Sequence, residues 1–261
     1  MPRLAANLST LFQELEFLDR FEAAAKAGFK GVELHFPYAI RPERIRKRLD
    51  DHGLELVAFD SPPGDWSAGE RGLAALHGRE DEFKRSIQRA AEYAEATRCK
   101  RLHVMAGIAR DPEGMEHSLE HYVDSLRYAA GFCGDRGIAV MIEPVNAIDA
   151  PDYFLNRPLQ ALDLLDAIKS RNLFLQYDVY DAQIMEGDLT TTISANVDVI
   201  RHIQIGGVPD RGEPDRGEVN YPYLFEVLDQ ICYDGWVGCD YKPRAGTLEG
   251  LAWAKPYGIT V

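Results

Sequence analysis

Short apolar runs alternate with amphipathic stretches from one end of the chain to the other. Val, Ile, Leu and Phe dominate the runs, which is typical of strands that are covered on both faces. Eight such runs can be counted, and they predict strands at residues 3–9, 31–35, 54–60, 101–105, 138–143, 173–178, 199–205 and 236–241.

The stretches between these runs carry the period of helices. Apolar side chains recur every three to four residues over residues 17–25, 83–94 and 119–133, and we interpret these stripes as core-facing. Gly53 and Gly137 each follow a helical stretch and precede a strand, where a left-handed helix cap favours glycine. The alternation therefore predicts successive strand–helix units around a parallel sheet.

Eight strand–helix units in 261 residues match the length at which one α/β barrel closes. We predict an α/β fold, a (β/α)₈ TIM barrel, built as one domain over residues 1–261. An open doubly wound sheet normally begins with a glycine-rich phosphate turn, and no Gly-x-Gly-x-x-Gly motif follows the first strand. The long connections at residues 61–79 and 206–220 are the expected functional loops.

The charge balance limits the expected partners. Lys and Arg total 29 against 42 Asp and Glu, and the formal net charge of −13 repels phosphate backbones and anionic membrane surfaces. We therefore expect neither nucleic acid nor a membrane as a partner. The first residues lack a signal-peptide pattern, so a cytoplasmic location is the default expectation. The sequence leaves the oligomeric state open, a homo-oligomer included.

Polar side chains end four consecutive predicted strands. Glu143 follows the fifth run, Asp178 ends the sixth, Gln204 lies near the end of the seventh, and Asp240 lies near the end of the eighth. A single acid at a strand end is more often a helix N-cap. Four polar residues on neighbouring strands favour a shared site instead, because the carboxyl ends of barrel strands carry the chemistry in this architecture.

Three carboxylates and one amide carbonyl form an all-oxygen set, which suits Mg²⁺ or Mn²⁺ better than zinc or copper. A cation relieves the repulsion among the acids. It also polarises a substrate carbonyl and holds an adjacent hydroxyl, which is the chemistry of aldose–ketose isomerisation. Direct proton shuttling between carboxylates, with no required metal, is the alternative.

Further polar residues are expected at the same barrel mouth and are candidates for binding a small acidic substrate. His103 lies within an apolar strand and has the chemistry to donate to a substrate oxygen. Arg71 and Arg211 lie in the two long loops, and arginine forms bidentate pairs with carboxylates. Lys242 follows Asp240 and is a second candidate for an anion.

These motifs resemble the hydroxypyruvate isomerase family of the xylose-isomerase-like TIM barrels, which includes 2-oxo-tetronate isomerases. The resemblance runs through the whole chain. It is carried by Ala6-Asn7-Leu8-Ser9, Pro63-Gly64-Asp65-Trp66, Gly69-Glu70-Arg71-Gly72, Ile142-Glu143-Pro144, Gln176-Tyr177-Asp178, His202-Ile203-Gln204-Ile205, Arg211-Gly212-Glu213-Pro214 and Gly238-Cys239-Asp240-Tyr241-Lys242-Pro243.

The resemblance implies that Glu143 and the acid at position 240 form the proton-transfer pair. It also implies that Glu143, Asp178, Gln204 and residue 240 can bind a divalent metal. The family pattern has glutamate at this last position, whereas this chain has Asp240, which is one methylene shorter. A general base must come within about 3 Å of its proton, so the shorter acid weakens the expectation for proton transfer more than that for metal binding.

The leading hypothesis is interconversion of hydroxypyruvate and tartronate semialdehyde through an enediolate. Glu143 is the preferred acid/base and Asp240 the second. Isomerisation of a four-carbon 2-oxo-tetronate is the nearest alternative, and a metal-dependent ketose 3-epimerase is another. DNA-repair endonucleases of the same superfamily need more histidine ligands and a basic face, and the sequence gives no evidence of either. A non-catalytic barrel that binds a small acid is the non-enzymatic alternative.

Overall fold

The computed structural model describes residues 1–109 and 115–260. Eight parallel strands close into a barrel in the order β1 to β8, with β8 pairing back onto β1. The strands are β1 (Arg3–Asn7), β2 (Gly31–Leu34), β3 (Glu55–Asp60), β4 (Arg101–His103), β5 (Ala139–Ile142), β6 (Leu173–Asp178), β7 (Ile200–Ile205) and β8 (Trp236–Cys239). The predicted barrel is confirmed, and most strands are shorter than their apolar runs.

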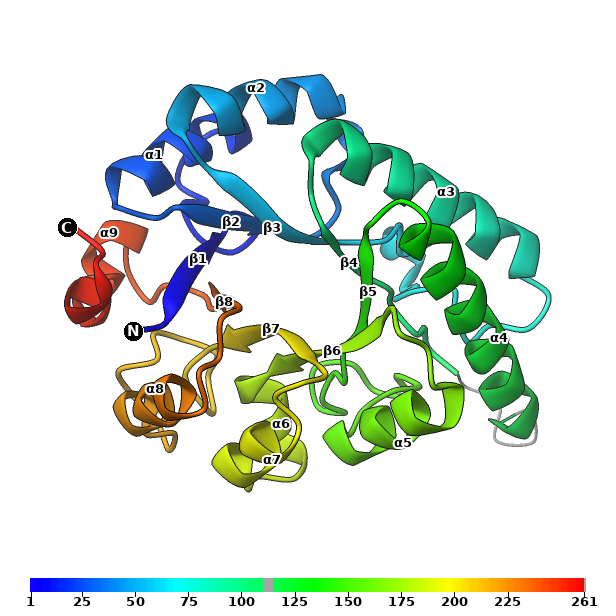
Figure 1. Ribbon diagram of the computed structural model, residues 1–261. Helices are drawn as coiled ribbons and strands as arrows, with labels where there is room; N and C mark the ends of the chain where they lie inside the picture. Colours follow the sequence, from blue (N-terminus) through cyan, green and yellow to red (C-terminus); the bar gives the residue numbers. More distant parts are fainter. Residues whose placement is uncertain (110–114, 261) are drawn as a thin grey trace.

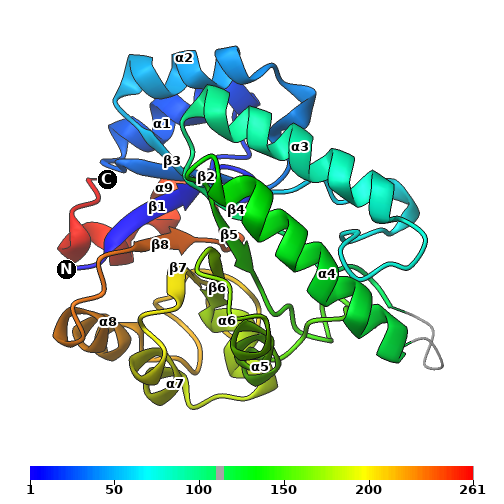
Figure 2. The ribbon, with the colours of Figure 1, turned by 45° about the vertical axis from the view of Figure 1, so that its right-hand side comes forward.

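Helices surround the barrel on its outer face (Figures 1 and 2). They are α1 (Arg20–Lys26), α2 (Pro42–His52), α3 (Glu80–Thr97), α4 (Met115–Gly134), α5 (Pro158–Ile168), α6 (Val179–Met185), α7 (Leu189–Ala195), α8 (Tyr221–Gln230) and α9 (Thr247–Gly250). Short 3₁₀ turns are η1 (Phe17–Asp19), η2 (Pro37–Ala39), η3 (Trp66–Ala68) and η4 (Ala252–Tyr257). None of the described helices is long and apolar enough to cross a membrane.

Two predicted helix ends use glycine in the left-handed conformation. Gly53 caps α2 with φ 64°, and Gly137 has φ 65° after α4. A side chain at these backbone angles would be strained, so glycine is the residue that lets the chain turn from each helix into the next strand.

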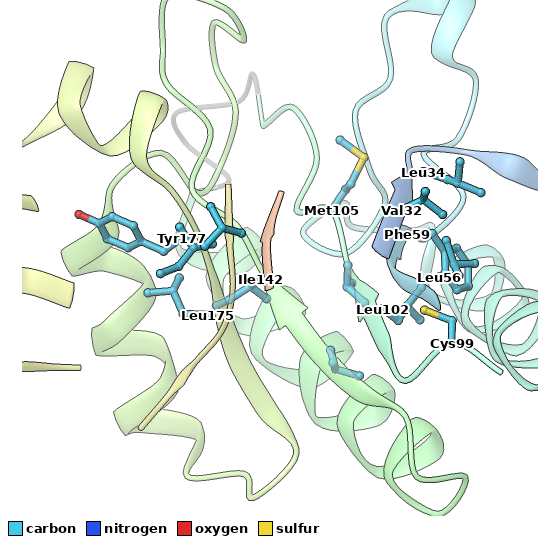
Figure 3. Packing of buried hydrophobic residues seen from close by; sticks show 14 of the residues in the cluster. Val32, Leu34, Leu56, Phe59, Cys99, Leu102, Met105, Ile142, Leu175 and Tyr177 are labelled. Atoms are coloured by element: carbon cyan, nitrogen blue, oxygen red, sulfur yellow. The ribbon is translucent and has the colours of Figure 1, made fainter. Parts of the chain in front are cut away.

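The alternation of side chains along each strand separates two apolar regions. Side chains that point outward, such as Val32, Phe59 and Leu102, pack in the large cluster shared by the strands and the surrounding helices (Figure 3). A smaller, separate cluster includes Met141 and Trp236. We interpret this second cluster as the apolar floor of the barrel interior.

Polar side chains occupy the inward positions that follow this floor. Asn7, Glu33, His103, Gln176 and His202 are all buried, and each belongs to a strand. Since strand residues of one face recur with a period of two, the same inward row continues beyond these positions to the strand ends. The barrel therefore changes from apolar to polar along its axis, toward the carboxyl ends of the strands.

The long connection between β3 and α3 is held at Gly72 against the segment that follows β4. This residue has φ 118°, and a Cβ atom there would lie 2.4 Å from the backbone oxygen of Met105. The Gly72 N–H donates to the Pro63 oxygen at 2.8 Å, so the loop also closes on itself. Only glycine permits this close approach, which fixes the course of the loop beside the barrel mouth.

Candidate active site

A cavity of about 360 Å³ opens at the carboxyl ends of the strands. Glu143, Gln204 and Asp240, which were predicted from strand ends, line it together with side chains from the connecting loops. Apolar contacts come from residues such as Phe36 and Met105. The cavity therefore combines a polar inner wall with a partly apolar rim, which is typical of sites for small polar substrates.

Glu143 is the first residue after β5 and is buried in this wall. Gln176 Nε2 donates to Glu143 Oε2 at 2.9 Å, and His103 Nδ1 lies 3.3 Å from the same oxygen. Burial raises the pKa of Glu143 well above its usual value, and the negative charges of Asp178 and Asp181 act in the same direction. A carboxyl group of this kind takes up and releases protons at a higher pH than a free one.

His103 lies between two carboxylates. Its Nδ1 is 3.0 Å from Asp60 Oδ1 as well as 3.3 Å from Glu143 Oε2. Asp60 and His103 are register partners on β3 and β4, so the pairing of the strands sets this contact. Because Nδ1 faces acceptors, it carries the proton in the neutral ring, and Nε2 is then an acceptor. This Nε2 is buried and has no hydrogen-bond partner among the described residues.

A chain of amides and acids extends from Glu143 into the barrel. Gln176 Nε2 also donates to Gln204 Oε1 at 3.0 Å, and Gln204 Nε2 donates to Glu33 Oε1 at 2.9 Å. His202 Nε2 makes a close hydrogen bond to the other oxygen of Glu33. These contacts fix both amide orientations, because each nitrogen faces an acceptor. His202 is thus paired with Glu33 and fully buried in the barrel.

Asp240 follows β8 and is held by three neighbours. Asn7 Nδ2 donates to Oδ1 at 2.8 Å, Arg211 Nη2 donates to Oδ2 at 2.7 Å, and His35 Nε2 lies 3.7 Å from Oδ1. Burial acts to raise the pKa of Asp240, but Arg211 and His35 outweigh it, and the pKa lies below its usual value. Asp240 is therefore a firmly held, ionised carboxylate.

Arg211 places its guanidinium among several acids. Besides Asp240, its Nη2 donates to Asp178 Oδ2, and its Nη1 lies 3.4 Å from Asp181 Oδ2. The Arg211 side chain also stacks on Tyr180, with 4.6 Å between the guanidinium carbon and the ring centroid. Burial acts to lower the pKa of Arg211, yet the surrounding carboxylates raise it well above its usual value. Arg211 is thus a permanent cation within the acidic wall.

Of the four predicted oxygen ligands, Glu143, Gln204 and Asp240 line the cavity, whereas Asp178 is not among its described lining residues. Asp178 lies behind Arg211, and its Oδ1 accepts the backbone N–H of the second residue of α6 at 2.8 Å. It therefore acts as the N-cap of that helix, the alternative role for an acid at a strand end. Asp181, on the first turn of α6, is the acid that lines the cavity instead.

Three acids nevertheless offer a site for a cation. One oxygen each from Glu143, Asp178 and Asp181 can be chosen so that all lie within 4.8 Å of one another. All three residues are buried, and burying like charges together favours a compensating cation. This donor set consists of oxygen alone, so it fits Mg²⁺ or Mn²⁺, and Arg211 already supplies one positive charge beside it.

The predicted substrate-binding residues divide into two groups. His103, Arg211 and Lys242 line the cavity. Arg71 lies outside the set of described residues that line it, because its guanidinium stacks on Trp66 at 3.6 Å from the ring centroid and donates to two loop carbonyls. Trp66 is the residue of that loop that reaches the cavity. Arg71 therefore contacts the cavity-lining Trp66, and its role in substrate binding stays a prediction.

Several site residues were missed from the sequence. Asp60 and Gln176 lie on strands at inward positions, and a strict count of alternate residues back from the strand ends would have found Gln176. Asp181 follows Asp178 by one helical turn, which also gives a sequence signal. Asn7 and Glu33 belong to the first two strands and meet the last strands only because the barrel closes.

Comparison with known proteins identifies the family. A family model described as the xylose isomerase-like TIM barrel matches residues 21–257. The chain belongs to this family. A crystal structure of a Brucella melitensis protein, described as an AP endonuclease of family 2, has a TM-score of 0.96 and 48% identity over 99% of this chain and 100% of its own.

Curated relatives within the family cover nearly the same length. A 2-oxo-tetronate isomerase of Cupriavidus necator is 50% identical over 98% of this chain and 99% of its own. A hydroxypyruvate isomerase of Escherichia coli is 45% identical over 98% of this chain and 100% of its own. More distant structures named as epimerases, at 20% identity and below, share the fold. The similarity thus extends over the whole barrel.

The contacts of Gln176 lead to a first prediction. We expect Gln176→Leu to lower kcat by about 10- to 100-fold, because it removes the N–H group that orients both Glu143 and Gln204. Steady-state kinetics with hydroxypyruvate and with a 2-oxo-tetronate measure the change in kcat. Gln183→Leu is the matched control, since that amide contacts Glu218 on the surface and should leave kcat unchanged. An unchanged kcat in Gln176→Leu would contradict the orienting role.

Proposed function

We propose that this protein is an isomerase of short hydroxylated 2-oxo acids, which interconverts hydroxypyruvate and tartronate semialdehyde. The observation that carries the proposal is Glu143, a buried carboxyl group of raised pKa in a polar cavity, held by Gln176 and His103. Two curated relatives of 45% and 50% identity over nearly the full length support it, since both are named as isomerases of such acids.

In the proposed reaction Glu143 moves a proton between neighbouring carbons. Its carboxylate removes a proton from the hydroxyl-bearing carbon of hydroxypyruvate, and the electrons of that bond form an enediolate. The protonated Glu143 then returns a proton to the adjacent carbon, while the hydroxyl proton moves to the oxygen of that carbon, which gives tartronate semialdehyde with no net gain or loss of atoms. A raised pKa suits both steps, because the same group must act as base and as acid.

Asp240 has a different part in this proposal. Its lowered pKa and its bonds to Asn7 and Arg211 keep it ionised, and its side chain is one methylene shorter than glutamate. We assign to it the acceptance of the substrate's hydroxyl proton and its return to the oxygen of the neighbouring carbon, and second place in proton transfer at carbon. Pairs of carboxyl groups with pKa values pushed apart divide acid and base roles in this way.

The substrate carboxylate requires a cation at the cavity wall. Arg211 and Lys242 both line the cavity and are the proposed partners, and His103 is the proposed hydrogen-bond partner of a substrate oxygen. Arg211 presents a planar set of donors beside the acids, so it orients an anionic substrate relative to Glu143.

A divalent cation, Mg²⁺ or Mn²⁺, is the proposed cofactor. Glu143, Asp178 and Asp181 would hold it, with Gln204 and Asp240 in the same cavity wall. When bound, such an ion polarises a carbonyl and stabilises the negative charge that develops on neighbouring oxygens.

A four-carbon 2-oxo-tetronate is the second candidate substrate. The relative from Cupriavidus necator carries that name at 50% identity, and the cavity of about 360 Å³ has room for the additional carbon. Ketose 3-epimerisation rests on more distant structures, which share the fold alone. DNA cleavage, which the name of the Brucella melitensis protein suggests, is disfavoured by the net charge of −13, which repels a phosphate backbone.

The substrate prediction is tested by comparing both acids. We expect turnover of hydroxypyruvate and of a 2-oxo-tetronate, with kcat/KM for one exceeding the other by at least about tenfold, since one carbon in a pocket changes binding by about 1–3 kcal/mol. Product formation is followed by NMR. Binding of both acids without turnover would contradict isomerase activity and support the non-catalytic barrel instead.

The metal prediction is tested by removal and return of the ion. We expect exhaustively chelated enzyme to lose activity by more than about tenfold and Mg²⁺ or Mn²⁺ to restore it, because the ion offsets the charge of three buried acids. Initial rates before chelation, after chelation and after return of each metal give the comparison. Full activity in the metal-free enzyme would contradict the requirement for a divalent cation. Arg211 would then be the cation that offsets the acids of the site.

A further inference from the structure

A second group of metal-ligating side chains lies away from the barrel mouth. His77 belongs to the end of the β3–α3 connection, Glu80 is the first residue of α3, and His121 lies on α4. One nitrogen or oxygen from each can be chosen so that all three lie within 4.8 Å of one another. Neither the candidate active site nor the family similarity assigns a role to these residues.

The distances within this group suit a metal with nitrogen and oxygen ligands. Glu80 Oε1 lies 3.4 Å from His77 Nδ1 and 3.3 Å from His121 Nδ1. In tetrahedral zinc sites the metal lies about 2.0–2.2 Å from nitrogen and oxygen ligands, so neighbouring ligand atoms are about 3.3 Å apart. Both distances to the carboxylate therefore correspond to an edge of such a site.

The two imidazoles are in close contact, and this contact involves Nε2 of His121, whereas its Nδ1 faces Glu80. His77 Nδ1 and His121 Nε2 are 2.6 Å apart, and the ring centroids are 4.5 Å apart. A contact between two ring nitrogens is a hydrogen bond only when one carries a proton and the other does not. Protonation of both rings would bring two positive charges together, whereas a metal uses neutral rings and their lone pairs.

A third histidine lies one helical turn away. His117 and His121 are separated by four residues on α4, so they are neighbours on one side of that helix. His117 and His77 are exposed, and Glu80 and His121 also line a separate surface cavity. An incoming metal ion therefore has open access, and His117 or water is available to complete its coordination.

We propose that His77, Glu80 and His121 form a second metal site, selective for Zn²⁺ or a similar transition metal ion. Mixed imidazole and carboxylate ligands distinguish it from the all-oxygen site at the mouth, which suits Mg²⁺ or Mn²⁺. The proposal does not depend on the isomerase function.

The site would connect the β3–α3 loop to α4. At the end of this loop Arg79 forms ion pairs with Glu70 and Glu82, and Glu70 accepts the backbone N–H of Asp65. The next residue, Trp66, lines the active-site cavity. A metal bound by His77 therefore holds one end of the loop that supplies part of the cavity wall.

The first test is the number of Zn²⁺ ions bound by the chelator-treated full-length protein, measured by equilibrium dialysis. We expect the wild type to bind one more Zn²⁺ per chain than His77→Ala or His121→Ala at the same free metal concentration. Asp51→Asn is the matched control, because this exposed acid lies on α2 and pairs with Lys47 instead. Circular dichroism checks that each variant is folded.

Equal Zn²⁺ stoichiometry in the wild type and in both folded histidine variants would overturn the site. Loss of the same ion from Asp51→Asn would do so as well, because the metal would then be bound by nonspecific negative charge. Two histidine variants at separate positions keep the test valid if one of them fails to fold.

Hydrogen exchange tests the connection to the loop. We expect Zn²⁺ to slow amide exchange at residues 61–79 in the wild type by at least about threefold and to leave His121→Ala unchanged, because loop opening would first require release of the metal. Zn²⁺ binding that leaves exchange in this loop unchanged would overturn its anchoring by the metal.

Discussion

Burial of several carboxylates inside a closed barrel is the constraint on which the rest of the site depends. An isolated ionised acid is expensive to remove from water, and neighbouring acids raise that cost. Arg211 offsets it for Asp178 and Asp240, while His103 and the amide of Gln176 do so for Glu143. Each of these partners comes from a different strand or loop, so the charges are compensated only when the barrel is complete.

The negative charges of Glu143 and Asp240 are compensated to different extents, and this difference determines the role of each acid. Glu143 has neutral or shared hydrogen-bond donors and a raised pKa. Asp240 has a full positive charge beside it and a lowered pKa. Glu143 is thus suited to exchange protons with carbon, whereas Asp240 rests in the ionised state from which it can accept a hydroxyl proton. The shorter side chain at position 240 is consistent with this division, because a carboxylate held by Arg211 and Asn7 needs little reach.

The barrel and much of the site could be predicted from the sequence. Strand ends are visible as breaks in apolar runs, so Glu143, Gln204 and Asp240 were found in the cavity wall. Asp178 caps α6, and no sequence pattern separates a capping acid from a lining one. The stacking of Arg71 on Trp66 depends on the path of a long loop, so the sequence could not show this contact. Contacts such as Glu33 with Gln204 join distant strands, so barrel closure was needed to find them.

Solvent deuterium exchange tests the role of Glu143 most directly. The enzyme is supplied with Mg²⁺ and hydroxypyruvate in D₂O, and NMR follows deuterium entering carbon, with the enzyme-free rate subtracted. We expect exchange by the wild type and a rate at least about 10²-fold lower in folded Glu143→Gln, because the amide cannot accept the proton. Exchange at the wild-type rate in Glu143→Gln would show that another group moves the proton and would contradict the assignment of Glu143 as the acid/base.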